Sequence, residues 1–201
     1  GGIGQHRDVD AELVGERVET VERCVGRDHE RRAAHRFDEL EQLAAWIRET
    51  GPSQWVRAWP WTWAICETLH FVGLSLVVGV IGLLDLRLMG FLPRIPLTAL
   101  RPMLPYGIAG FLVNLATGLV FFIGTPEQYV TNVAFGMKLL FLAISGLNVL
   151  YFETRHGHRL LTLADGEPMP AAFKVAGAVS LASWMMVLYW GRMLPYIGNA
   201  F

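Results

Sequence analysis

Charged residues are scarce in most of this sequence. Residues 61–201 contain only eight Lys or Arg and six Asp or Glu, whereas residues 1–60 contain nine and twelve. The net charge of the chain is −1. A protein that binds a nucleic acid needs an excess of basic residues to displace the counterions of the phosphates. The composition therefore predicts no nucleic-acid partner.

Cysteine is almost absent as well, with only Cys24 and Cys66 in the chain. Two distant thiols form no C-x-x-C pair, no zinc-binding set and no haem-attachment motif, and they exclude a disulfide framework. The first 36 residues are charged almost throughout, so they lack the apolar core of a secretory signal peptide.

Long apolar runs are what this sequence has in abundance. There are four, at about 61–84, 103–124, 133–152 and 171–194, and each reaches the ~20 residues that a helix needs to cross a bilayer. The runs are apolar nearly all round, whereas a soluble bundle carries a polar stripe on each helix. We predict an all-α integral membrane fold, a bundle of four transmembrane helices with antiparallel neighbours.

The remaining sequence divides into two segments that precede this domain of residues 61–201. Residues 1–36 form a charged tail, helical or disordered. Residues 37–60 combine a short amphipathic helix, at 37–50, with a Trp-rich linker. An amphipathic helix followed by a tryptophan cluster is typical of the membrane interface.

The basic residues are unevenly shared between the loops. The loops around 91–102 and 156–170 carry Arg and Lys, and the loop 124–132 carries none. Loops rich in Lys and Arg usually face the cytoplasm. We therefore expect both termini on the opposite side of the membrane.

A few polar residues interrupt the apolar runs. An ionisable side chain at membrane depth is costly unless it faces protein or water, so each marks a candidate site. Glu67 and His70 share one face of the first helix, and His70 lies roughly 10 Å below the outer surface. Lys138 begins the third helix, Arg192 ends the fourth, and Asn114 lies in the second. The spacing predicts one polar layer on the outer side.

Three interpretations of this layer remain open. In the first, His70 ligates a haem iron, Glu67 fixes its tautomer, and Lys138 or Arg192 neutralises a propionate; a deprotonated Lys138 could instead be the sixth ligand. In the second, Glu67 and Lys138 form an internal salt bridge and His70 is a structural hydrogen-bonding residue. In the third, the layer is part of a proton or ion path.

Two further histidines, His156 and His158, lie in the basic loop, where a solvated pair is favoured over a metal site. The E-x-x-H spacing of Glu67 and His70 also occurs in di-iron bundles. Such bundles repeat the motif on a second helix, and this chain does not.

The stretch from Trp46 to Gly90 is similar to the opening of a bacterial family of uncharacterised four-helix membrane proteins. The motif that carries the resemblance is E-x-L-H, which includes Glu67 and His70, followed by DLRLMG at residues 85–90. The resemblance covers roughly residues 37–194. It implies a multi-pass protein of the bacterial inner (cytoplasmic) membrane and leaves the activity undefined.

A more distant likeness is to HemJ-type and CopD-like haem b membrane proteins. His70, Gly79, Arg87-Leu88 and Lys138-Leu139 match the HemJ-type pattern. The sequence VVGVIGLLDLR at 77–87 replaces the aromatic Leu-Pro-Arg character of that family, which speaks against porphyrin oxidation. The resemblance implies haem b, held by His70.

These observations lead to one functional hypothesis and one alternative. The hypothesis is a haem b-binding membrane protein with a role in membrane electron transfer or oxidoreduction, in contact with a redox partner or with further copies of itself. The candidate cofactor-binding residues are His70, which is also the metal ligand, Lys138, Glu67, Arg192 and Asn114. The alternative is a non-enzymatic accessory subunit with an internal polar network. The sequence assigns no catalytic residue.

Overall fold

The computed structural model describes residues 30–162 and 167–197, with only the backbone of residues 161 and 162. Helices account for most of these residues, and none of them lies in a β-strand. The chain divides into two units, Gly1–Leu43 and Ala44–Phe201. The predicted tail of residues 1–36 lies mostly outside the described residues.

One helix covers residues 30–49 and crosses the boundary between the units. Its side chains from Glu30 to Leu43 are largely exposed, and His35 and Glu39 approach to 3.3 Å one turn apart. The helix predicted at 37–50 therefore exists but starts earlier, because the Arg- and Ala-rich stretch before Phe37 contains no helix breaker.

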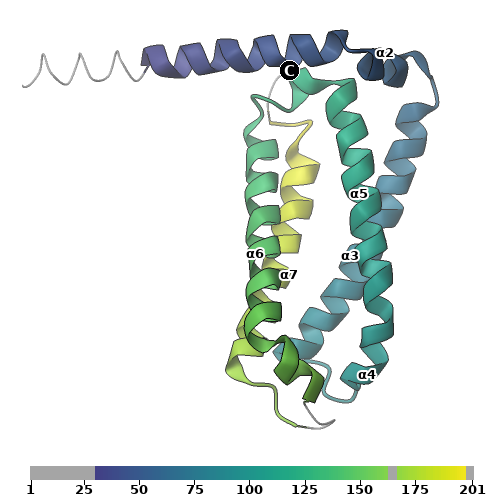
Figure 1. The fold of residues 1–201 in the computed structure, drawn as a ribbon, viewed down its shortest axis with the longest axis vertical. Helices are drawn as coiled ribbons and strands as arrows, with labels where there is room; N and C mark the ends of the chain where they lie inside the picture. The colour runs from purple at the N-terminus through teal and green to yellow at the C-terminus, as the bar shows by residue number, and fades with distance from the viewer. Residues whose placement is uncertain (1–29, 163–166, 198–201) are drawn as a thin grey trace, which may run out of the picture. The chain divides into compact units, whose positions relative to one another are not determined.

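Four long apolar helices make up most of the second unit (Figure 1). Their bounds are Thr62–Met89 for α3, Leu104–Gly124 for α5, Val133–Thr162 for α6 and Ala171–Met193 for α7. A short helix, α2, precedes them at Gly51–Ala58, and α4 occupies Leu97–Leu100. Each long helix can span a bilayer by length and composition. The protein is an all-α, multi-pass integral membrane protein.

Two of the helices extend beyond the predicted spans. α3 continues through Asp85 and Arg87 to Met89, and it ends where Gly90 adopts φ 95°, a conformation that glycine accepts without strain. α6 continues through the charged stretch that follows Phe152. Hydrophobicity defines the membrane-crossing part of a helix, whereas the helix itself persists until a breaker such as glycine or proline.

The packing order of the helices differs from their order in the chain. α3 packs against both α5 and α7, and α7 also packs against α6, whereas α5 and α6 make few close backbone contacts. At one end Asn132 donates to the carbonyl oxygen of Leu194 at 3.0 Å, and at the other Arg101 donates to that of Leu160 at 2.6 Å. Successive long helices are therefore antiparallel, as predicted.

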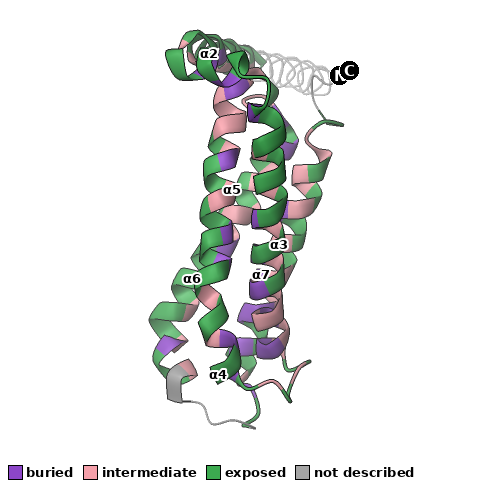
Figure 2. Ribbon diagram, turned by 90° about the vertical axis from the view of Figure 1, so that its right-hand side faces the viewer, coloured by how far each residue is buried: buried purple, intermediate pink, exposed green. Residues whose placement is uncertain are grey.

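Large apolar side chains are exposed along all four long helices, whereas the buried residues cluster between them (Figure 2). A cluster of buried residues joins Leu88, Leu97, Met169 and Phe173, at the end that holds α4. Exposed apolar surface on this scale is typical of helices that face lipid acyl chains.

The closest helix crossing is that of α3 over α5. A Cβ atom added at Gly73 would lie 2.7 Å from the carbonyl oxygen of Gly110, and one added at Gly110 would lie 2.7 Å from that of Gly73. The two backbones can approach this closely only because both residues lack a side chain. This crossing sets the position of α5 relative to the first half of α3, which begins at Thr62.

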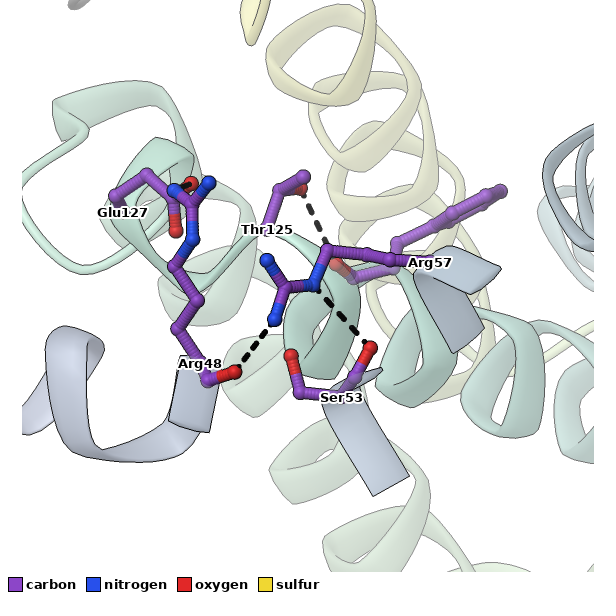
Figure 3. Close-up of polar contacts among 6 residues, drawn as sticks. Arg48, Ser53, Arg57, Thr125 and Glu127 are labelled. Atoms are coloured by element: carbon purple, nitrogen blue, oxygen red, sulfur yellow. Dashed lines mark hydrogen bonds and ion pairs between the residues drawn. The ribbon is translucent and has the colours of Figure 1, made fainter. Parts of the chain in front are cut away.

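The segment before α3 is tied to the loop between α5 and α6 (Figure 3). Arg48 and Glu127 form an ion pair at 2.5 Å, and Arg57 donates to the carbonyl oxygens of Arg48 and Ser53 at 2.6 and 3.3 Å. Val56 of α2 lies over Gly124 at the end of α5. These contacts fix α2 to the end of the bundle from which α3 starts, and Trp55 of α2 stacks on Trp59, which follows the helix.

Candidate functional site

His70 lies at the α3–α5 contact, and its imidazole is hydrogen-bonded to Thr117 of α5. Nδ1 of His70 and Oγ1 of Thr117 are 2.7 Å apart. The Thr117 hydroxyl also donates to the carbonyl oxygen of Val113 at 2.8 Å. We assign the tautomer from this network: a hydroxyl has one proton, so a Thr117 that donates to Val113 accepts from Nδ1–H. The imidazole therefore carries its proton on Nδ1 and keeps the lone pair of Nε2.

A free Nε2 lone pair is what a metal ligand requires. Nε2 makes no hydrogen bond to the residues that the structure describes. A histidine that binds a metal through one ring nitrogen usually donates from the other to a fixed acceptor. Thr117 is such an acceptor, because its own proton is committed to the backbone of α5.

Asn114 holds the backbone of α3 at His70. With its amide oriented so that both ends are satisfied, it donates to the carbonyl oxygen of His70 at 2.7 Å and accepts from the N–H of Leu74 at 3.0 Å. The amide also lies against Gly73, where an added Cβ would be only 2.6 Å away. Asn114 thus contacts the main chain of the candidate ligand and positions it.

An aromatic pair, Phe121 with Trp63 behind it, lies beside the imidazole near the start of α3 and the end of α5. The ring centroids of His70 and Phe121 are 5.7 Å apart, and those of Phe121 and Trp63 are 5.0 Å apart. These rings present apolar surface beside the imidazole, which would shield a bound apolar group from water.

Lys138 approaches the same region from α6. Its side chain lies over Gly191 of α7, where an added Cβ would be 3.9 Å from Nζ. It is near enough to His70 for its charge to act on the ring. No carboxylate of the described residues lies within 4.0 Å of its ammonium group. An ammonium group at membrane depth without a counter-ion favours an anionic ligand.

Glu67 and Arg192 lie at the same end of the bundle but outside this group of contacts. Glu67 is exposed on α3, and its carboxylate makes no ion pair or hydrogen bond with the described residues. Arg192 is exposed near the end of α7, where it reaches the hydroxyl of Tyr196 at 3.5 Å and its ring at 5.6 Å. The structure therefore brings His70 into contact with Asn114 and with Thr117, which takes the place expected for Glu67, whereas Lys138 lies against α7 at Gly191.

The two further histidines, His156 and His158, lie at the opposite end of the bundle. His156 is surrounded by the rings of Tyr151, Phe152 and Phe173, with centroids 5.7 to 6.1 Å away. Within the described part of the chain, no group of three or more His, Cys, Asp or Glu side chains could hold a metal ion. His156 is thus half-buried among aromatic rings, which differs from the solvated pair that the sequence favours.

Sequence reasoning did not identify Thr117. A lone threonine in an apolar run is usually bonded to its own helix, as Thr117 partly is. A weak signal existed: Asn114, Thr117 and Gly118 are the small or polar residues of α5 near its middle, spaced by three and four. Comparison of the chain with protein-family models, with curated proteins and with solved structures finds no match.

Proposed function

We propose that this membrane protein binds haem b through Nε2 of His70 and serves in membrane electron transfer or oxidoreduction. The observation that carries the proposal is the hydrogen bond from His70 to Thr117, since it leaves Nε2 unprotonated. A bound haem would supply a one-electron couple that no side chain of this site provides.

The remaining residues fit the other parts of such a cofactor. Lys138 provides a positive charge near the imidazole, with no protein carboxylate to neutralise it, so a propionate is a suitable counter-ion. Phe121 and Trp63 provide apolar contacts. Asn114 and Thr117 of α5 fix the backbone and the ring of His70.

The accessory-subunit alternative needs an internal network of paired charges. Its central element is a salt bridge between Glu67 and Lys138, and the described residues form no such pair within 4.0 Å. An ammonium group such as that of Lys138, which has no protein carboxylate beside it, is better explained by a bound anionic ligand than by a structural role. We therefore favour the haem proposal.

Replacing Thr117 by valine tests the tautomer directly. Valine keeps the shape of threonine and removes the acceptor of Nδ1–H, so haem affinity should fall by about 10–100-fold, the usual effect of losing a partner behind a metal ligand. Haem titration of the purified apoprotein, followed by absorbance, measures the change.

The matched control is Thr117→Ser, which keeps the hydroxyl and should keep the affinity close to that of the wild type. Equal affinity of the valine variant and the wild type would contradict the role of Thr117.

The orientation of the bundle follows from the distribution of charge at its two ends. Arg94, Arg101 and Lys174 lie at the end with α4, whereas the loop between α5 and α6 has no Lys or Arg. We infer that the α4 end faces the cytoplasm of a bacterial inner membrane, which places His70 on the outer side.

Labelling single cysteines from outside intact cells tests this orientation, in a background in which Cys24 and Cys66 are replaced by serine. A membrane-impermeant maleimide should modify a cysteine at Gln128 and should not modify one at Arg94. The reverse pattern would place His70 near the cytoplasmic side and overturn the inference.

A further inference from the structure

A second polar group lies at the other end of the bundle, at the contact of α3 and α7. Asp85 of α3 is only 3% exposed and Ser180 of α7 only 4%. Ser180 lies near enough to the Asp85 carboxyl group for its side chain to interact with it. An added Cβ at Gly177 would lie 2.8 Å from the carbonyl oxygen of Asp85, so α7 covers this turn of α3 closely.

One oxygen of the carboxyl group has no partner. Oδ2 of Asp85 is buried and makes no hydrogen bond. An ionised carboxylate accepts several hydrogen bonds in a folded protein, and leaving one oxygen buried and bare is costly. A carboxylic acid needs fewer acceptor contacts, because one of its oxygens carries a proton.

The nearby basic groups do not neutralise this carboxyl group. Arg87 on the same helix is buried, and its Nε donates to the carbonyl oxygen of Ile95 at 2.6 Å. Lys174 of α7 extends over Gly90, with Cε 3.8 Å from an added Cβ there.

The other charged or titratable groups that the structure describes at this end are Arg94 and Arg101 of the segment after α3, Glu153, Arg155, His156, His158 and Arg159 of α6, and Glu167 before α7. Among the described residues, none of the Lys, Arg or His side chains lies within 4.0 Å of Asp85. Arg87 is directed to the backbone of the next segment and not to Asp85.

We propose that Asp85 and Ser180 form a proton-binding site within the membrane domain. The Asp85 carboxylate takes up one proton from the aqueous phase to give the neutral acid, and Ser180 donates to its other oxygen. Asp85 lies four residues before the end of α3, or about 6 Å along the helix, so the proton comes from the side of the 91–102 loop. Carboxyl groups of this kind are the usual proton carriers of membrane proteins.

Infrared spectroscopy of the full chain in phosphatidylcholine vesicles tests the site. At neutral pH the protein should show the carbonyl stretch of a protonated carboxylic acid, and Asp85→Asn should remove it. Ser180→Ala should shift this band to higher frequency, because the acid loses a hydrogen bond, whereas Ser180→Thr should leave it close to its original position. Glu153→Gln, at an exposed position of α6, should leave the band intact.

Three outcomes would overturn the proposal: no such band at neutral pH, a band that persists in Asp85→Asn, or a band that Ser180→Ala does not move. The last comparison remains decisive if Asp85→Asn fails to fold. The measurement needs no haem, so its result is independent of the function proposed for the site at His70.

Discussion

Replacing His70 by alanine is expected to abolish haem binding and the Soret band of the purified protein. The side chain supplies an imidazole nitrogen that hydrogen bonding leaves ready to coordinate, since Thr117 fixes the proton on Nδ1. Haem content per protein, measured by the pyridine haemochrome method, should fall to background, while the purified protein remains helical by circular dichroism.

Three companion variants sharpen this result. His70→Gly should regain a Soret band when imidazole is added, because the free base can occupy the place of the lost ring. His158→Ala, at the opposite end of the bundle, should retain full haem content. Lys138→Ala should weaken haem binding. If the ammonium group pairs with a propionate, Lys138→Arg should bind haem as the wild type does, because arginine keeps the charge and cannot ligate iron. A His70→Ala protein with an unchanged spectrum would refute the ligand assignment.

Replacing Gly110 by alanine is expected to destabilise the membrane domain more than any other single methyl addition to α5. The new Cβ would lie 2.7 Å from the carbonyl oxygen of Gly73 and from Cβ of Leu76, and a backbone atom cannot move aside as a side chain can. Overpacking of this kind costs about 1–3 kcal/mol or more. Unfolding in mixed detergent micelles, followed by circular dichroism, measures the loss.

Gly118→Ala on the same helix is the matched control. An added Cβ at Gly118 meets nothing within 4 Å, so alanine should be neutral or should stabilise the helix by up to about 1 kcal/mol. Equal stability of the two variants would show that the crossing at Gly73 and Gly110 is looser than the structure indicates. Because Asn114 lies one turn from Gly110, the Gly110 variant should also weaken haem binding.

The architecture was predictable because a bilayer constrains chiefly the length and the hydrophobicity of each segment that crosses it. A run of about 20 apolar residues must be a helix that spans the membrane, and four runs with short connections give antiparallel neighbours. The starts of α5, α6 and α7 agree with the predicted spans to within a residue, since Pro or a polar residue marks each of them. α3 and α6 extend beyond the ends of the predicted spans, because hydrophobicity falls where a helix leaves the membrane and not where the helix itself ends.

The neighbours of each helix were harder to predict than the helices. Hydrophobicity shows that a helix lies in the membrane, but it does not show which other helices that helix contacts. The contact of α3 with both α5 and α7 depends on close approaches at Gly73, Gly110 and Gly177, and glycine is common in these spans. Only the geometry distinguishes a glycine at a crossing, such as Gly110, from one that faces open space, such as Gly118.

The contacts of His70 differ from those that the sequence predicts. Membrane depth counted along each helix predicts that His70 and Lys138 lie at the same level, and their joint role in one site stays a prediction. The partner of His70 was assigned to Glu67 because residues three apart share a helix face. The imidazole instead points toward α5, where Thr117 is 47 residues away in sequence. Long-range pairs of this kind carry no local signal.

The visible absorption spectrum of the wild-type protein, purified from haem-sufficient cells, tests the central claim most directly. The proposed function predicts a Soret band in the oxidised protein, which shifts and sharpens on reduction by dithionite, as expected of haem b with a histidine ligand. A colourless protein that also fails to acquire a Soret band when haem is added would contradict the proposal, and the polar group at His70 would then be a structural feature of the α3–α5 contact.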